Sequence, residues 1–242
     1  MNKSEGLYSY DVDLKKLRNR FGTKYTLHYG DINKLTLPIT VLSIDPGTKS
    51  MGIRIDKISE EKSQCIYENI VELEDTDSFP YSVLRYIENI IEYIPQCNLI
   101  LLERQLSVNK NMIVVENVLC SIFMAISFTG KILLDRYVQK DIIHRVSVKK
   151  LMNNNCCIVS VSSKLKGIFY KDKMDKKLSF DIAKGIIDKR YPKINQKDWN
   201  SMRLKNLSKD IKKMNAKQRS DIGDTVLQMY AFILGIGLLD SI

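Results

Sequence analysis

Four acidic residues of this chain follow patterns that bring carboxylates together. Asp45 ends a short buried apolar run and precedes a turn, and Glu103 ends a second, continuous apolar run. Asp221 and Asp224 are spaced i, i+3, so they share one face of a helix expected over 220–238. Acids fixed at strand ends and on one helix face predict a carboxylate cluster.

Carboxylate oxygens are the natural ligands of Mg²⁺ and Mn²⁺. A cluster of acids without a cation would suffer repulsion, which raises the pKa of its members. Two divalent ions about 4 Å apart would make the cluster a phosphodiester-cleaving device. One ion helps to deprotonate and position a water, and the other stabilises the departing 3′ oxygen. No histidine base is required, which suits a chain with only His28 and His144.

Each acid also has a purely structural interpretation. The sequence Asp45-Pro46-Gly47 is ordinary turn chemistry for a hairpin. Asp221 and Asp224 are expected in the first turn of their helix, where the helix dipole favours carboxylates. The combination of all four acids favours the metal site over these separate explanations.

The elements that must position the acids alternate between strands and helices. The hairpin over 41–56 and a third strand over 65–73 have short connections, which predicts antiparallel pairing. Later elements follow from apolar runs and helical spacing. They are a helix over 81–93, a strand over 99–103, a helix over 112–128, strands at 132–134 and 142–148, and a helix over 178–189. This order predicts an α/β fold.

The charge of the chain indicates an anionic partner. Lys and Arg number 38 against 28 Asp and Glu, a formal net charge of +10, which favours nucleic acid first and a membrane surface second. The excess concentrates from Lys131 onward. The segment 153–177, expected to be polar and irregular, interleaves Phe169 and Tyr170 with lysines and suits contact with phosphates and bases, or a solvated loop. Its lysines are Lys164, Lys166, Lys171, Lys173, Lys176 and Lys177.

Composition argues against several other classes of protein. No apolar run approaches the roughly 18 residues of a membrane span, and the first residues lack the pattern of a signal peptide. The five cysteines are unpatterned, which suits free thiols in a reducing compartment, and no zinc site is expected. Residues 1–38 are predicted to form a basic N-terminal extension, with a possible short helix over 14–21, ahead of a domain over 39–242.

Four short motifs resemble those of the RuvC resolvases of the RNase H-like superfamily, over about residues 40–238. Ile44-Asp45-Pro46-Gly47-Thr48, with Gly52-Ile53, resembles the first motif, and Leu101-Leu102-Glu103-Arg104-Gln105 resembles the second. Val146-Ser147-Val148-Lys149-Lys150 is similar to the strand that ends in an active-site lysine. Asp221-Ile222-Gly223-Asp224 resembles the paired aspartates of the last helix. The order of the motifs is most similar to that of the poxvirus Holliday junction resolvases.

The resemblance implies a mixed sheet, three antiparallel strands and then parallel ones, flanked by helices. It implies a homodimer that makes paired, symmetric nicks in four-way DNA junctions, with two Mg²⁺ per active site and Mn²⁺ as a substitute. Asp45, Glu103, Asp221 and Asp224 would be the metal ligands. Lys149 would lie near the scissile phosphate, with Lys150 as the alternative, and a second lysine contact would fall at Lys176 or Lys177. The products would carry 5′-phosphate and 3′-hydroxyl ends.

For the poxvirus branch the resemblance further implies resolution of replicated concatemers in the host cytoplasm. The apolar faces of the helices over 81–94 or 112–128 are the expected dimer interface. Three other interpretations remain open. One is an RNase H-like nuclease acting on RNA–DNA hybrids or transposon ends, and another is a non-catalytic basic DNA-binding protein. The third, an actin-like ATPase, lacks a second phosphate loop, so no nucleotide cofactor is expected.

Overall fold

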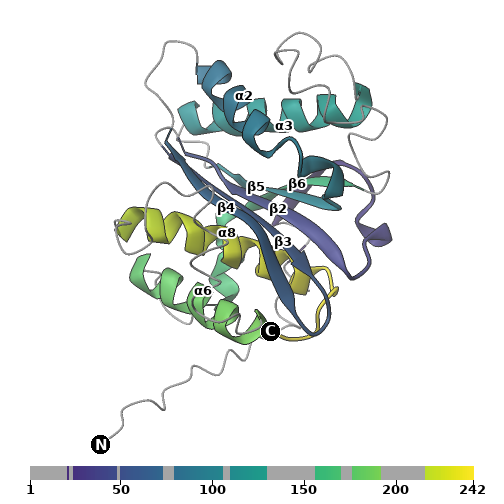
Figure 1. Cartoon of the computed structure of the whole chain (residues 1–242), viewed down its shortest axis with the longest axis vertical. Helices are drawn as coiled ribbons and strands as arrows, with labels where there is room; N and C mark the ends of the chain where they lie inside the picture. The colour runs from purple at the N-terminus through teal and green to yellow at the C-terminus, as the bar shows by residue number, and fades with distance from the viewer. Residues whose placement is uncertain are drawn as a thin grey trace, which may run out of the picture.

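A mixed six-stranded β-sheet forms the centre of the molecule (Figure 1). In this computed structural model the described residues are 21, 24–47, 50–72, 79–105, 110–129, 156–169, 176–191 and 216–242. The strands are β1 (Tyr25–Tyr29), β2 (Ile39–Asp45), β3 (Ser50–Ile58), β4 (Ser63–Glu72), β5 (Leu99–Arg104) and β6 (Cys157–Ser162).

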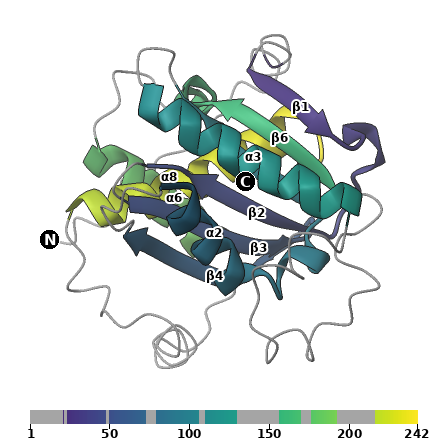
Figure 2. The ribbon, with the colours of Figure 1, turned by 90° about the horizontal axis from the view of Figure 1, so that it is seen from above.

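The strand order is β1-β6-β5-β2-β3-β4, which Figure 2 shows from above. Strands β2, β3 and β4 pair antiparallel, whereas β5 runs parallel to β2 and β6 runs parallel to β5. Strand β1 is antiparallel to β6 at one edge. The predicted α/β fold, with three antiparallel strands followed by parallel ones, is confirmed.

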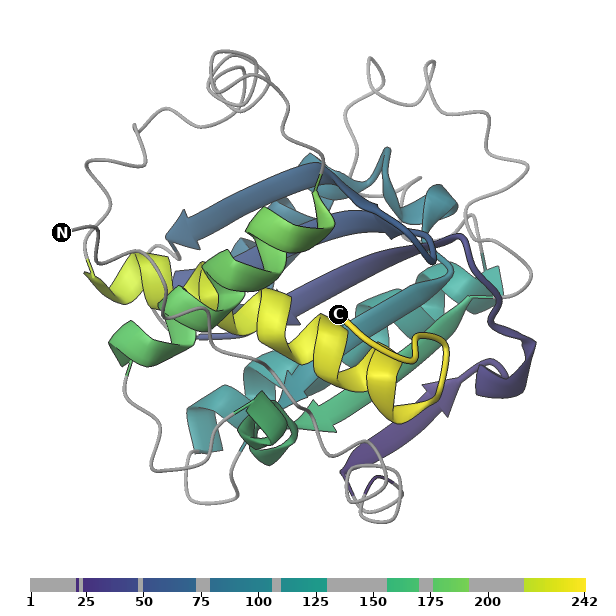
Figure 3. The ribbon, with the colours of Figure 1, turned by 90° about the horizontal axis from the view of Figure 1, so that it is seen from below.

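Helices cover both faces of the sheet. Helices α2 (Phe79–Ile90) and α3 (Lys110–Thr129) lie on one face. Helices α6 (Lys176–Arg190) and α8 (Ala216–Gly235) lie on the other, as seen from below in Figure 3. Short 3-10 turns occur at η1 (Ile32–Lys34), η2 (Ile94–Gln96) and η4 (Ser163–Phe169).

Alternation along the central strands fills a core on each face. In β2, Ile39 and Val41 pack in the core beneath α8, whereas Leu42 and Ile44 pack in the core beneath α2 and α3. Strand β5 divides its apolar residues in the same way. Because both faces of β2 and β5 are covered, these strands read as continuous apolar runs in the sequence.

Two strands differ from the prediction. Segment 153–177 is not irregular throughout, because β6 and η4 occupy residues 157–169. Serines interrupt the apolar pattern of β6, although Ser160 is buried. Strand β1 comes from the segment 1–38 and was not predicted; Tyr25 and Phe21 from the same segment pack with Phe232 of α8. The strands expected at 132–134 and 142–148, and most of the helix expected over 14–21, lie outside the described residues.

The apolar faces of α2 and α3 pack on the sheet, so the predicted use of these faces for dimerisation is wrong. Val83 and Ile87 of α2, and Val115, Leu119 and Phe123 of α3, belong to the core of one chain. Among the described helices, only α3 is long and apolar enough to cross a membrane by length and composition. Its buried face, with Val115, Leu119 and Phe123, accounts for part of this composition.

A buried ion network ties α6 to the far end of β3. The Arg54 guanidinium, fully buried, donates to Asp56 Oδ2 at 2.8 Å and also contacts Glu68. Tyr191, just after α6, donates its hydroxyl to Asp56, and its ring lies under the guanidinium with 5.3 Å between Arg54 Cζ and the ring centroid. This network anchors one end of α6 to the sheet.

Replacing Arg54 with Met is expected to lower the free energy of unfolding by about 3–5 kcal/mol, because two buried carboxylates lose their partner. Urea denaturation of the variant and the wild type measures the difference. The matched control is Lys184→Met, which removes an exposed ion pair with Asp188 and should change stability by about 0–1 kcal/mol. Equal effects of the two substitutions would contradict the importance of the network.

Candidate functional site

Two carboxylates stand at the same edge of the sheet because they end neighbouring parallel strands. Asp45 is the last residue of β2, and Glu103 is the next-to-last residue of β5. The register pairs Ile44 with Leu102, and each acid is the next residue of its strand, so Asp45 and Glu103 lie side by side. Both belong to the side of the sheet that α8 covers, and this geometry brings the two predicted strand-end acids together.

The other two predicted acids lie on α8, deeper in the helix than expected. The helix begins at Ala216 rather than at residue 220, so its first turn contains no acid. Asp221 and Asp224 therefore do not act as first-turn partners of the helix dipole. Stabilisation by the helix dipole therefore does not explain this pair of aspartates, and a functional cluster remains as the explanation.

Helix α8 packs closely against β2 and β3 near the strand ends that carry the acids. A Cβ atom at Gly52 would lie 2.8 Å from the carbonyl oxygen of Asp221, so only glycine admits the helix backbone here. Ser43 of β2 donates its hydroxyl to the carbonyl of Thr225 at 3.0 Å. On the other side of the helix, a Cβ at Gly223 would lie 3.3 Å from the Cα of Phe180 in α6. The two glycines let α8 fit between the sheet and α6.

A buried lysine lies among the acids. Lys166 of η4 places its Nζ 2.6 Å from Glu103 Oε2 and 3.4 Å from Asp224 Oδ2, with its side chain only 4% exposed. Burial by itself lowers the pKa of this ammonium, but the charges of Glu103, Asp45 and Asp224 outweigh burial and raise the pKa overall. Lys166 is therefore a permanent positive charge at neutral pH.

The other three acids of the cluster act electrostatically on the Asp45 carboxyl. The pKa of the Asp45 carboxyl is raised well above its usual range, first by burial and next by the charge of Glu103. Lys166 opposes the shift, whereas Asp224 and Asp221 add to it. One ammonium thus offsets only part of the negative charge, and the cluster favours a further cation.

Two serines bond to the aspartates of α8. Ser50, the first residue of β3, donates to Asp221 Oδ2 at 3.3 Å. Ser179 of α6, which is buried, donates to Asp224 Oδ1 at 2.7 Å. Each aspartate is therefore oriented by a hydroxyl from a different element, which restricts its rotamers.

The donor set fits a hard divalent cation, since all four side chains offer carboxylate oxygens. Among the described residues, no three acidic, histidine or cysteine side chains converge closely enough in this conformation to hold an ion. The Lys166 ammonium occupies the space between Glu103 and Asp224. Joint binding of an ion by these two carboxylates therefore requires the ammonium to move.

The structure does not describe the side chains of the predicted lysines, whereas it describes those of the four acids. Lys149 and Lys150 lie outside the described residues, and Lys176 and Lys177 are described only as backbone in the first turn of α6. The lysine that the structure brings to the carboxylates is Lys166, which the sequence analysis named only as one of the lysines of the basic segment 153–177. The β-branched run just before it, Ile158 to Val161, was the available signal for a strand leading into the site.

Comparisons with known proteins concern the fold. No protein-family model and no curated protein sequence matches the chain. Among solved structures, the yeast mitochondrial Holliday junction resolvase Ydc2 matches with a TM-score of 0.54 at 16% identity, over 94% of this chain and 95% of that chain.

Two further structures match over similar lengths. Thermus thermophilus RuvC has a TM-score of 0.48 at 11% identity, over 80% of this chain and 95% of that chain. The Fowlpox virus resolvase, in complex with Holliday junction DNA, has a TM-score of 0.43 at 14% identity, over 80% of this chain and 97% of that chain. By its similarity to the yeast enzyme, the chain shares the fold of that resolvase, an α/β fold with a mixed sheet between two layers of helices.

Proposed function

We propose that this protein is a structure-specific DNA endonuclease, a Holliday junction resolvase, which makes paired symmetric nicks in four-way DNA junctions. The observation that supports the proposal is the meeting of Asp45, Glu103, Asp221 and Asp224 at one edge of the sheet. The fold shared with a yeast enzyme of that name adds to it. The basic net charge of +10 suits a polyanionic substrate.

In the proposed site the four carboxylates would hold two Mg²⁺ ions, or Mn²⁺ in their place. These ions, when bound, supply an activated water and stabilise the leaving 3′ oxygen. The chain's own residues prepare this arrangement. Ser50 and Ser179 orient the aspartates of α8, and Lys166 holds a positive charge that a scissile phosphate can share with Glu103. Lys149, or Lys150 in its place, and Lys176 or Lys177 remain proposed phosphate contacts.

The proposal includes a homodimer, because symmetric nicks on opposing strands need two active sites. In this proposal the nuclease domain spans residues 39–242, and the segment 1–38 adds strand β1 to its sheet. The resemblance to the poxvirus branch extends the proposal to resolution of viral concatemers in the host cytoplasm. The products are strands with 5′-phosphate and 3′-hydroxyl ends.

Replacing Asp221 with Asn tests the proposed site against a merely DNA-binding role. Nicking of a labelled synthetic four-way junction in Mg²⁺ is expected to fall by at least about 10³-fold, since a ligand charge is lost. Junction binding should persist or tighten, because repulsion of the phosphates is relieved.

The matched control is Asp188→Asn, an exposed acid of α6 paired with Lys184, which should nick as the wild type does. Unchanged nicking by Asp221→Asn would contradict the metal site. If neither the wild type nor the control nicks any branched DNA, but both bind it, the protein is a non-catalytic DNA-binding protein.

A further inference from the structure

Three basic residues lie at or just beyond the ends of three neighbouring strands, beside the carboxylate cluster. Arg104 follows Glu103 directly at the end of β5 and pairs in register with Ser162 of β6. The backbone N–H of Ser162 donates to the carbonyl of Lys24, just before β1, at 2.7 Å. Lys164 is exposed and lies two residues past Ser162. Lys24, Arg104 and Lys164 thus form a basic row across the ends of β1, β5 and β6.

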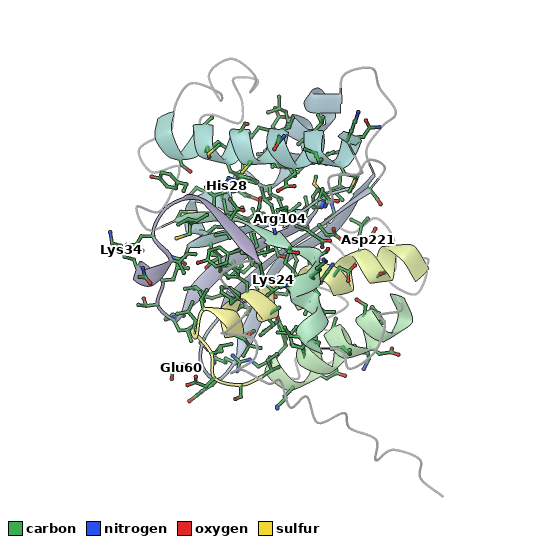
Figure 4. All side chains as sticks on the ribbon, turned by 180° about the vertical axis from the view of Figure 1, so that it is seen from behind. Lys24, His28, Lys34, Glu60, Arg104 and Asp221 are labelled. Atoms are coloured by element: carbon green, nitrogen blue, oxygen red, sulfur yellow. The ribbon has the colours of Figure 1, made fainter. Side chains whose placement is uncertain are left out.

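Strand β1 holds the arginine of this row. Arg104 Nη1 donates to Thr26 Oγ1 of β1 at 3.2 Å. This bond extends the half-buried guanidinium along the edge of the sheet. In Figure 4, Arg104 is labelled above Lys24 and to the left of Asp221. The edge strand therefore has a specific effect on the orientation of an arginine next to the site.

The backbone that carries Glu103 and Arg104 is also fixed. The N–H of Gln105 donates to the buried Glu116 carboxylate of α3 at 2.8 Å, and Gln105 Nε2 donates to the carbonyl of Glu103 at 3.1 Å. Because side chains alternate along a strand, Glu103 and Arg104 point to opposite faces of the sheet. A strand of nucleic acid laid across this edge would meet both.

Within the described part of the chain, no ion pair neutralises the positive charges of this row. Among the described residues, neither Arg104 nor Lys24 nor Lys164 forms an ion pair, whereas Lys166 pairs with Glu103 and Asp224. An arginine with a planar, preorganised fork suits a phosphate, which it can bind with two hydrogen bonds.

We propose that Lys24, Arg104 and Lys164 form a binding site for a DNA backbone phosphate next to the scissile one, with Thr26 as the residue that orients Arg104. This inference rests on the proposed function, since it names the path of the substrate strand. By holding one phosphate of the substrate strand, the three residues determine which neighbouring phosphate enters the carboxylate site. Phosphate contacts of this kind give register and affinity rather than base specificity.

The test measures binding of a four-way DNA junction, in Ca²⁺ to suppress cleavage, over a range of salt concentrations. Arg104→Gln is expected to bind about tenfold more weakly than the wild type and to lower the slope of log affinity against log salt by about one. Thr26→Val, which keeps the side-chain shape, is expected to weaken binding about threefold.

The matched control is Lys62→Gln, the same loss of charge at an exposed residue of the β3–β4 turn, at the opposite end of the sheet. It should bind nearly as the wild type does. Circular dichroism melting checks that each variant is folded. If the wild type binds but Arg104→Gln keeps the wild-type slope, the phosphate site is contradicted while the proposed function stands. If the wild type binds no branched DNA, the proposed function fails and the inference fails with it.

Discussion

Replacing Asp45 with Asn is expected to abolish nicking and, at the same time, to stabilise the protein in the absence of metal. The pKa of Asp45 is raised well above its usual value by burial and by Glu103, Asp224 and Asp221. Ionisation of this carboxyl at neutral pH is therefore easier in the unfolded chain than in the folded one. An amide of the same shape removes the buried charge and the repulsion.

The sign of the pH dependence follows from the same shift. A carboxyl whose folded pKa is raised gives its full contribution to stability below the unfolded pKa, and that contribution is lost as pH rises through the folded pKa. In EDTA, the wild type should thus lose stability as pH increases from about 4 toward neutrality relative to Asp45→Asn. The melting temperature of the variant at pH 7 should be higher by about 2–4 °C for each kcal/mol of repulsion removed.

Divalent ions should reverse the order of stability. Mn²⁺ stabilises a protein in proportion to its affinity for the folded state, so it should raise the melting temperature of the wild type more than that of Asp45→Asn. Ser162→Ala, near the site but without a carboxylate, serves as the control for general effects of substitution. A variant that is less stable than the wild type in EDTA at pH 7 would contradict the electrostatic account of Asp45.

Replacing Lys166 with Met is expected to reduce nicking by about 10²–10³-fold, because a positive charge beside the reacting phosphate is lost. The same change should destabilise the metal-free protein, since Glu103 loses a buried partner at 2.6 Å and Asp224 a weaker one. The ammonium and a divalent ion compete for these two carboxylates. Metal binding in the absence of DNA should therefore be tighter in the variant.

Calorimetric titration with Mn²⁺ measures this competition directly, and thermal melting with and without Mn²⁺ gives an independent check. Lys62→Met, an exposed lysine in the β3–β4 turn, is the matched control and should leave the Mn²⁺ affinity unchanged. Weaker Mn²⁺ binding by Lys166→Met than by the control would show that the lysine supports the metal site instead of competing with it.

Local patterns predicted the elements that carry the four acids. The apolar runs of β2 and β5 are covered on both faces, so each reads as a strand that ends in an acid. The hairpin and helix α3 also follow from short-range signals. These elements were sufficient to anticipate that Asp45 and Glu103 would each end a strand and belong to one cluster.

Long-range contacts account for what the sequence analysis missed. Serines interrupt the apolar run of β6, and the burial of Ser160 depends on a hydrogen bond with His28, which lies 132 residues earlier. Lys166 resembles any lysine of a basic segment, and its partner Glu103 is 63 residues away. Strand β1 is mostly exposed, so it carries little apolar pattern. None of these pairings leaves a periodic signal in the chain.

The start of α8 was misplaced for a related reason. The acids at 221 and 224 suggested a helix that begins beside them, but the helix begins at Ala216, and Gly52 and Gly223 bring its middle to the sheet. The glycine between the two aspartates is explained by the approach of α6. A requirement of packing, rather than of capping, determines this part of the sequence.

The most direct measurement is cleavage of a labelled synthetic four-way DNA junction beside a linear duplex of the same sequence, in Mg²⁺, in Mn²⁺ and in EDTA. We predict paired symmetric nicks in the junction alone, with either metal, and none in EDTA. Cleavage of the linear duplex or of an RNA–DNA hybrid instead would contradict junction specificity while retaining the metal site. Binding without cleavage under every condition would contradict the assignment of the four carboxylates.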